Sequence, residues 1–331
     1  MSDPTTVRFL HVANGSCTTD IIEAARLPGA RSIWADPLYE GPVPAGLSDD
    51  ELLNVRARYL AGPDEDATVN PMNDLRVWRQ VIADHESYDE LVLWFEHDLF
   101  DQLNLIQLLT WIRGRPASRV ASLVCIGSFP GRPRFKGLGE LLPDELASLF
   151  ETRQAISNAE YDLAERAWEA FRRPSPEAVD ALREADTTAL PYLGAAIERF
   201  LQEYPSTMDG LSRSERRLLR LADPGPIAVK VAFPRMHDEE NTYYITDGGL
   251  ADLVTTLSRT SPPLVTRADD GSVDVGLLGG TISLTSAARE VLTGRRDRAA
   301  CGIDRWLGGV HLQSGAPIWR WDDEQRRIRS S

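Results

Sequence analysis

The chain has little cysteine. Only three of its 331 residues are cysteines, Cys17, Cys125 and Cys301, and they form no CxxC pair. A disulfide framework or a cysteine zinc site needs clustered cysteines, so we expect neither. Free and widely spaced thiols are typical of a reducing compartment.

Long hydrophobic runs are also missing. No apolar stretch approaches the roughly 20 residues of a transmembrane helix, and the start, MSDPTTVRFL, lacks the basic and apolar regions of a signal peptide. We therefore expect a cytoplasmic protein with no membrane association.

Basic residues are outnumbered. Lys and Arg total 36 against 50 Asp and Glu, a formal net charge of −14. This charge opposes the field of a phosphate backbone, so tight non-specific binding to nucleic acid is not expected unless a local basic patch provides it. Neither GxGxxG nor a P-loop is present, so the sequence indicates neither a dinucleotide fold nor a P-loop NTPase.

What remains is an ordinary globular composition, 42% hydrophobic and 26% charged, in a chain long enough for two or three domains. The predicted class is α/β. We divide the chain into an α/β ligand-binding domain (1–141), a helical connector (142–206) and a winged-helix-like α+β module (207–331).

The amino-terminal part alternates strand and helix patterns, which predicts a mostly parallel sheet flanked by helices. The predicted strands are 7–13, 31–36, 89–95 and 119–127, and the predicted helices are 21–27, 48–62, 72–85 and 101–113. After residue 142 the pattern is helical. From 209 onward we expect a helix, a second helix, a strand pair around DDG and GG, a further helix and one terminal β-hairpin.

Polar clusters follow three successive predicted strands. They are residues 14–19, 36–41 and 96–98. Open parallel sheets bind ligands outside the carboxyl ends of their strands, where loops and helix N-termini converge. We therefore predict one cleft there, lined by Asn14, Glu40, Glu96 and Asp98.

The first cluster is suited to an anion. In NGSCTTD, Gly15 allows close approach of the backbone, and the first turn of the following helix carries free N–H groups. We expect Asn14, Gly15, Ser16 and Thr18 to bind ligand. The alternative is that Gly15 makes the turn and Ser16 or Thr18 caps the helix.

The third cluster, FEHDLFD, is suited to a cation or to acid–base chemistry. Glu96, His97 and Asp98 are candidate catalytic residues, and Glu96 and Asp98 are also candidate metal ligands. Helix capping is the alternative for Asp98 and Asp101, and a hydrogen-bonded structural role is the alternative for His97.

The second cluster and the next helix add Asp36, Glu40, Arg56 and Arg58 as candidate ligand-binding residues. The arginines would clamp a carboxylate or phosphate. Alternatively, Asp36 belongs to a turn and the arginines pair with neighbouring acids.

A divalent cation would reconcile an acidic crevice with an anion loop, since carboxylates hold Mg²⁺ while the metal bridges a substrate phosphate. We therefore predict a small phosphate-bearing or nucleotide-like ligand, with a metal-assisted hydrolase or transferase activity. The alternative is a ligand-sensing regulator or interaction module, in which Arg213, Arg216, Arg217 and Arg220 form one exposed face of a helix. Homo-oligomerisation is left open.

Five segments carry a resemblance that covers nearly the whole chain: HVANGSCTTD, WADPLYEGPVP, LWFEHDLFDQLNLIQLL, GLSRSERRLL and RWLGGVHLQSGAPIWRWD. They resemble the bacterial domain-of-unknown-function family 1835, with a carboxyl-terminal region similar to its companion domain 3658. Many relatives read Asn-Gly-Asp-Ser where this chain has Asn14, Gly15, Ser16 and Cys17, so an acid at position 16 is not essential here. The family implies no established activity, but its motifs coincide with the predicted crevice.

Overall fold

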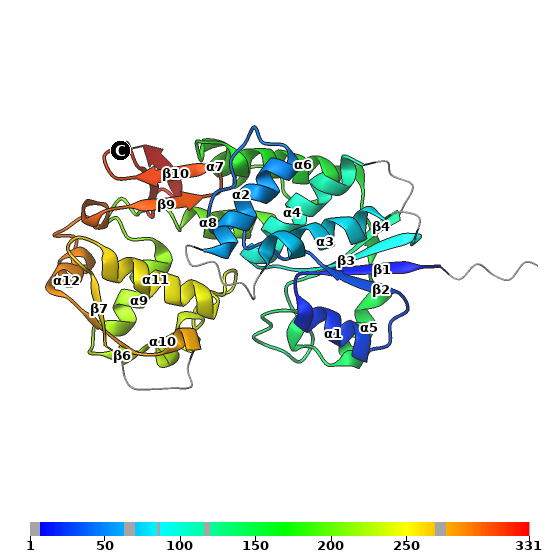
Figure 1. Cartoon of the computed structure of the whole chain (residues 1–331), viewed down its shortest axis with the longest axis horizontal. Coiled ribbons are helices and arrows are strands. Elements are labelled where there is room, and N and C mark those ends of the chain that lie inside the picture. Colours follow the sequence, from blue (N-terminus) through cyan, green and yellow to red (C-terminus); the bar gives the residue numbers. More distant parts are fainter. Residues whose placement is uncertain (1–6, 63–69, 85–86, 116–119, 269–275, 331) are drawn as a thin grey trace, which may run out of the picture.

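The computed structural model describes residues 7–62, 70–84, 87–115, 120–268 and 276–330 (Figure 1). The chain is mixed α/β, with a largely parallel sheet in its amino-terminal part and small antiparallel sheets in its carboxyl-terminal part. This confirms the predicted fold class. Among the described residues, no helix is both long enough and apolar enough to cross a bilayer.

The main sheet has five strands in the order β2-β1-β3-β4-β5. Its strands are β1 (Phe9–Ala13), β2 (Ala30–Ile33), β3 (Glu90–Glu96), β4 (Val120–Ile126) and the short β5 (Gln154–Ala155). The first four pair in parallel, as predicted, whereas β5 joins β4 antiparallel from beyond residue 141.

Both faces of the sheet are covered, because β3 is apolar on both sides. Leu91, Leu93 and Phe95 belong to the large core under α4, whereas Val92 and Trp94 pack into a second core with α1 and α5. This arrangement is typical of a parallel sheet, whose strands read as continuous hydrophobic runs. The helices concerned are α1 (Ser16–Ala24), α2 (Asp49–Ala61), α3 (Pro71–Ala83), α4 (Leu99–Arg113) and α5 (Pro143–Phe150).

The first helix begins earlier than expected. The apolar spacing predicts a helix over 21–27, but α1 starts at Ser16. The polar residues of its first turns satisfy one another, since the Thr19 hydroxyl donates to the Ser16 carbonyl and the Thr18 hydroxyl to the Asn14 side chain. The loop NGSCTTD is therefore mostly helix.

The predicted helical connector contains α6 (Asn158–Arg172), α7 (Glu177–Leu182) and α8 (Leu193–Leu201), of which α6 and α8 pack against α4.

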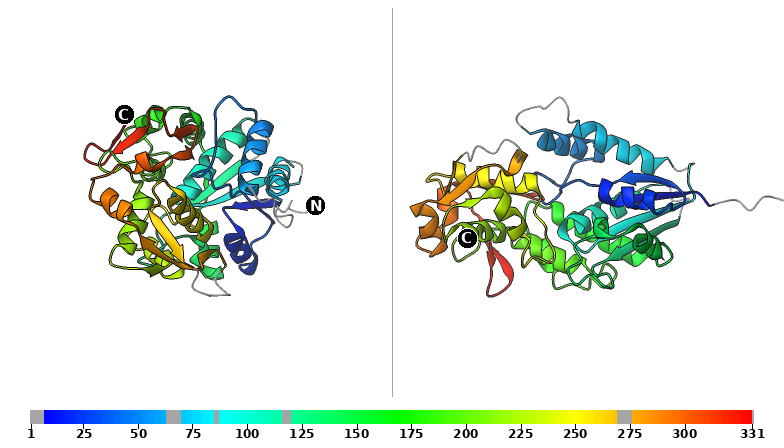
Figure 2. Two further views of the ribbon diagram at one scale, coloured as in Figure 1. Left: turned by 60° about the vertical axis from the view of Figure 1, so that its left-hand side comes forward. Right: turned by 90° about the horizontal axis from the view of Figure 1, so that it is seen from below.

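The carboxyl-terminal part lies at the end of the molecule away from the main sheet (Figure 2). Its first elements are α9 (Arg213–Ala222), β6 (Ile227–Ala228), α10 (Val229–Met236), α11 (Asp247–Arg259), β7 (Val265–Ala268), β8 (Thr281–Leu284) and α12 (Ser286–Leu292).

These elements form a three-stranded antiparallel sheet, β6-β8-β7, against α9, α10 and α11. The elements predicted from the sequence include neither β6 nor α10, because β6 is only two residues long and α10 contains Pro234. The predicted DDG turn lies outside the described residues.

The predicted single terminal hairpin is instead two hairpins, formed by β9 (Asp304–Leu307) with β10 (Val310–Gln313) and by β11 (Trp319–Asp322) with β12 (Arg327–Ser330).

A buried ion pair fixes the loop that follows β2. Arg56 of α2 donates to both carboxylate oxygens of Asp36, with its closest contact at 2.7 Å, and also to the carbonyl oxygens of Pro37 and Glu40. The two side chains are 1% and 3% exposed. The guanidinium therefore sets the path of residues 36–40.

Replacing Arg56 by Gln should lower the free energy of unfolding by about 3–5 kcal/mol, because it leaves the Asp36 carboxylate buried without its cation. The matched control is Arg58→Gln, an exposed position on the same helix, for which we expect a change within about 0.5 kcal/mol. Urea unfolding of both variants measures the difference. Equal effects would show that the pair does not stabilise the fold.

Candidate functional site

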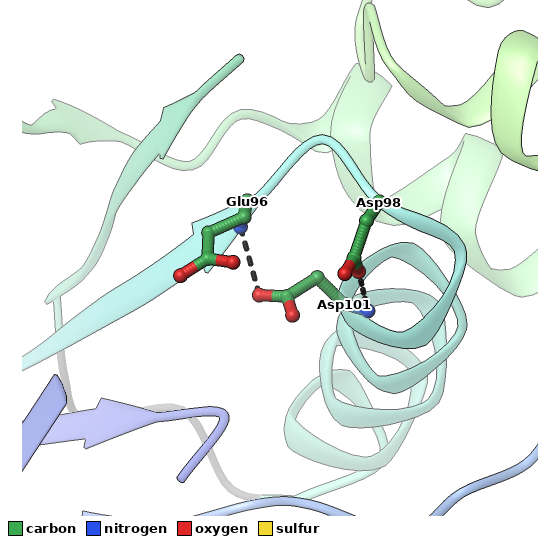
Figure 3. Close-up of side chains that lie close together, drawn as sticks. All are labelled: Glu96, Asp98 and Asp101. Atoms are coloured by element: carbon green, nitrogen blue, oxygen red, sulfur yellow. Dashed lines mark hydrogen bonds between the residues drawn. The ribbon is translucent and has the colours of Figure 1, made fainter. Parts of the chain in front are cut away.

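The turn from β3 into α4 brings three carboxylates together (Figure 3). Glu96 ends β3, and Asp98 is the N-cap of α4, its Oδ1 accepting the backbone N–H of Asp101 at 2.8 Å. The Asp101 carboxylate points back and accepts the backbone N–H of Glu96 at 2.8 Å. Capping thus explains the position of Asp98, but Asp101 instead bridges the strand to the helix.

One oxygen from each of Glu96, Asp98 and Asp101 can be chosen so that all lie within 4.8 Å of one another. The residues are 5%, 9% and 0% exposed. Among the described residues, no arginine, lysine or histidine forms an ion pair with any of the three. In the described part of the chain, the other acids with little exposed surface, Asp36, Glu203, Asp209 and Glu215, each have an arginine partner.

Backbone N–H groups orient the Glu96 side chain. Its Oε1 accepts from Leu138 N at 2.5 Å, in the short 3-10 helix η1 (Leu138–Glu140). The carboxylate also lies so close to Gly137 that any Cβ at this position would collide with it. Glycine at 137 is therefore required for the carboxylate to sit here.

Asn14 connects β1 to this cluster. Its amide donates to Asp101 Oδ2 at 2.6 Å, while its Oδ1 accepts from the hydroxyl of buried Thr18 at 3.3 Å. The end of β1 and the end of β3 thus meet at one edge of the sheet, as predicted.

Gly15 and Ser16 are accessible at the start of α1. Gly15 has an extended φ of 175°, and an added Cβ would meet nothing within 4 Å. The α1 N-terminus has no side-chain cap. Neither a tight turn nor crowding therefore requires glycine at this position, and Ser16 does not cap the helix.

Burial raises the pKa of all three carboxyls. Desolvation, followed by the charge of Asp98, raises the pKa of Glu96 to about 8. Desolvation raises the pKa of Asp98 to about 6 and the pKa of Asp101 well above its usual value. The cluster therefore retains protons at neutral pH unless a cation replaces them.

His97 turns to a different environment. Its ring lies between Phe135 and Tyr192, with centroids 6.3 and 6.2 Å away, and burial lowers its pKa. Among the described residues, no hydrogen bond or ion pair joins the ring to the three carboxylates. A catalytic role for His97 remains a prediction.

The second polar cluster is divided between two environments. Asp36 and Arg56 bond to each other, and Arg58 is exposed. Glu40 lines a separate cavity whose lining includes none of Asn14, Glu96 and Asp98. Their roles in ligand binding remain predictions, but the geometry of the carboxylate cluster does not depend on them.

The candidate site residues predicted from the sequence do not include Asp101, for which helix capping was one alternative, and they do not include Gly137 or Leu138. The Asp98–Asp101 spacing fits capping, so it does not by itself show a third cluster member. Nothing in the local sequence links residues 137–139 to β3.

The chain matches no protein-family model, and no curated protein matches it in sequence. The resemblance to family 1835 and its companion domain therefore remains a prediction.

The raised pKa values give a testable dependence of stability on pH. With chelator present, the folded protein holds protons that the unfolded chain releases, so the free energy of unfolding should fall as pH rises from about 4.5 to about 8. Glu96→Gln should flatten this fall, whereas Glu324→Gln, at an exposed position, should leave it unchanged. Urea unfolding across this range measures the slope. The same slope in wild type and Glu96→Gln would contradict the burial of an ionisable Glu96.

Proposed function

We propose that the α/β domain binds a small phosphate-bearing or nucleotide-like ligand through a divalent cation held by Glu96, Asp98 and Asp101. The supporting observation is that these three acids are buried, have no basic partner among the described residues, and can place one oxygen each within 4.8 Å of one another. Burying several carboxylates without cations is costly. A metal ion would remove this cost.

The donor set fits a hard cation. Mg²⁺ and Ca²⁺ prefer carboxylate oxygens, and Mg²⁺ usually keeps waters and substrate phosphates among its ligands. Asn14 and the N–H groups of Glu96 and Leu138 hold the carboxylates in fixed orientations. Such hydrogen bonds around the ligands orient a metal site and adjust its affinity.

The start of α1 supports an anionic ligand beside the cation. The N-terminus of a helix carries partial positive charge and free N–H groups. Gly15 leaves open space there, and Asn14 connects this turn to Asp101 through one hydrogen bond. Gly15, Ser16 and Thr18 are therefore the proposed contacts for a phosphate.

The proposed reaction class is metal-assisted hydrolysis or group transfer. When bound, the cation would polarise a phosphoryl oxygen and lower the pKa of a coordinated water. The chain itself supplies the fixed carboxylates and excludes water around Glu96. We further propose that the protein acts in the cytoplasm and that its amino-terminal domain belongs with family 1835.

The second candidate is a ligand-sensing regulator whose carboxyl-terminal module is winged-helix-like. The order α9, β6, α10, α11, β7, β8 with the sheet β6-β8-β7 supports this shape. DNA binding is disfavoured, because the arginines of α9 are largely engaged. Arg213 pairs with Glu240, Arg216 with Asp209 and Arg217 with Glu239. A role in protein contacts fits this module better.

A thermal-shift series with Mg²⁺, Mn²⁺, Ca²⁺ and Zn²⁺, each with and without nucleotides and sugar phosphates, tests the proposal. A ligand at a hundredfold excess over its Kd adds about 2.7 kcal/mol, a shift of a few degrees for a chain of this size. We expect Glu96→Gln, Asp98→Asn and Asp101→Asn each to remove the response to metal.

The control is Asp20→Asn, which removes an exposed carboxylate from α1 and should respond like the wild type. The proposal fails if no metal moves the wild-type melting temperature. It also fails if the three cluster variants shift as the wild type does.

A further inference from the structure

A cavity of about 820 Å³ is lined by residues of the α/β domain and of the carboxyl-terminal module. Glu40 and Gly41 after β2, Tyr59 of α2, and residues 301–306 contribute to its walls. Its size falls within the range of small-molecule sites, about 300–1,000 Å³. The proposed metal site does not use it.

One face of α11 forms a wall of this cavity. The lining residues from this helix are Gly249, Asp252, Leu253, Thr256 and Arg259. Their spacing places them on one side of the helix, while Leu250, Val254 and Leu257 are buried on the other. In helix-turn-helix modules the recognition helix presents such a face to DNA. Here the face lines the cavity and carries an acid, Asp252.

Most charges in the cavity wall are already paired. Glu203 binds Arg199 and Arg305, Glu215 binds Arg298, and Asp304 contacts His311. The carboxylates of Glu40 and Asp252 have no ion pair or hydrogen bond with any described side chain or backbone group. Arg259 is the one lining base left without an ion pair among the described residues, and it is exposed. Among the described residues the lining thus has two unpaired acids, partly buried Glu40 and exposed Asp252, against one unpaired base.

Glu40 is the deeper of the two unpaired acids. Its Oε1 lies over the first turn of α11, where a Cβ at Gly249 would be only 3.1 Å away. Burial raises the pKa of Glu40 to about 7, although the charge of Arg305 opposes this shift. Asp252 lies one helical turn beyond Gly249 on the same face. The charge of Asp252 is one of the causes that raise the pKa of Glu40, so a cation bound beside Glu40 would interact favourably with both carboxylates.

We propose that this cavity binds a small organic amine, whose ammonium group donates hydrogen bonds to Glu40 and Asp252. An ammonium group supplies three N–H donors and a positive charge, which two carboxylates can share. A metal fits less well. The one described group of three or more acids, cysteines or histidines with ligand atoms close enough for an ion is Glu96, Asp98 and Asp101, and it does not include Glu40.

Isothermal titration of the full chain with two amines, putrescine and phenethylamine, tests this site. Each amine has a neutral hydroxyl analogue as its partner, butanediol or phenylethanol. We expect at least one amine to bind at least tenfold more tightly than its analogue. Glu40→Gln should weaken this binding at least tenfold, and Asp252→Asn should weaken it by a smaller factor.

Two controls separate this site from other effects. Asp50→Asn, an exposed change on α2, and Glu96→Gln, in the carboxylate cluster, should both bind the amine like the wild type. Glu40→Gln should keep the wild-type melting temperature or exceed it, since the carboxylate has no partner to lose. The proposal is overturned if neither amine binds better than its analogue, or if Glu40→Gln binds it as tightly as the wild type.

Discussion

The carboxylate of Asp101 holds together the corner where β1, β3 and α4 meet. This carboxylate accepts hydrogen bonds from the backbone N–H of Glu96 and from the side-chain amide of Asn14. The backbone N–H of Asp101 donates to the Asp98 carboxylate. A typical hydrogen bond contributes about 0.5–1.5 kcal/mol to stability, and more when one partner is charged. The ends of two strands and the start of a helix are thereby fixed relative to one another. The carboxylates of Glu96, Asp98 and Asp101 are buried at this corner.

This arrangement leaves three buried carboxylates close together without a basic partner among the described residues. Asp36, Glu203, Asp209 and Glu215 are instead paired with arginines, most closely Asp36 with Arg56 and Glu203 with Arg199. Glu96, Asp98 and Asp101 accept hydrogen bonds from N–H groups but have no basic partner among the described residues. Burial raises the pKa values of all three carboxyls, and the charges of neighbouring carboxylates raise those of Glu96 and Asp101 further, so protonation is favoured when no cation is bound. Strongly shifted groups of this kind gather at functional sites.

Much of the fold could be predicted from the sequence. The central strand β3 is a nearly continuous apolar run, and the position of Asp98 before α4 follows from capping. The predicted edge of the sheet is also where Asn14 and the cluster meet. Short elements were missed, because β5 and β6 have two residues each and carry too little pattern.

The site itself was only partly predictable. Local spacing places Glu96 and Asp98 correctly, but the contact of Glu96 with residues 137–138 depends on tertiary packing. The environment of Glu40 also depends on tertiary packing. Its carboxylate lies beside Gly249 of α11, a helix more than two hundred residues away along the chain. In each proposed site, residues at the end of a predicted strand contact a segment far away in the sequence. The end of β3 contacts residues 137–138, and the loop after β2 contacts α11. No sequence pattern predicts these contacts.

The most direct test of the carboxylate cluster is a crystal structure of the protein grown with Mn²⁺, using anomalous scattering to locate the metal. We expect a peak between Glu96, Asp98 and Asp101, about 2.0–2.6 Å from their oxygens, the range of Mg²⁺ and Ca²⁺ sites. No peak at the cluster, with the three carboxyls still held only by N–H donors, would contradict the account.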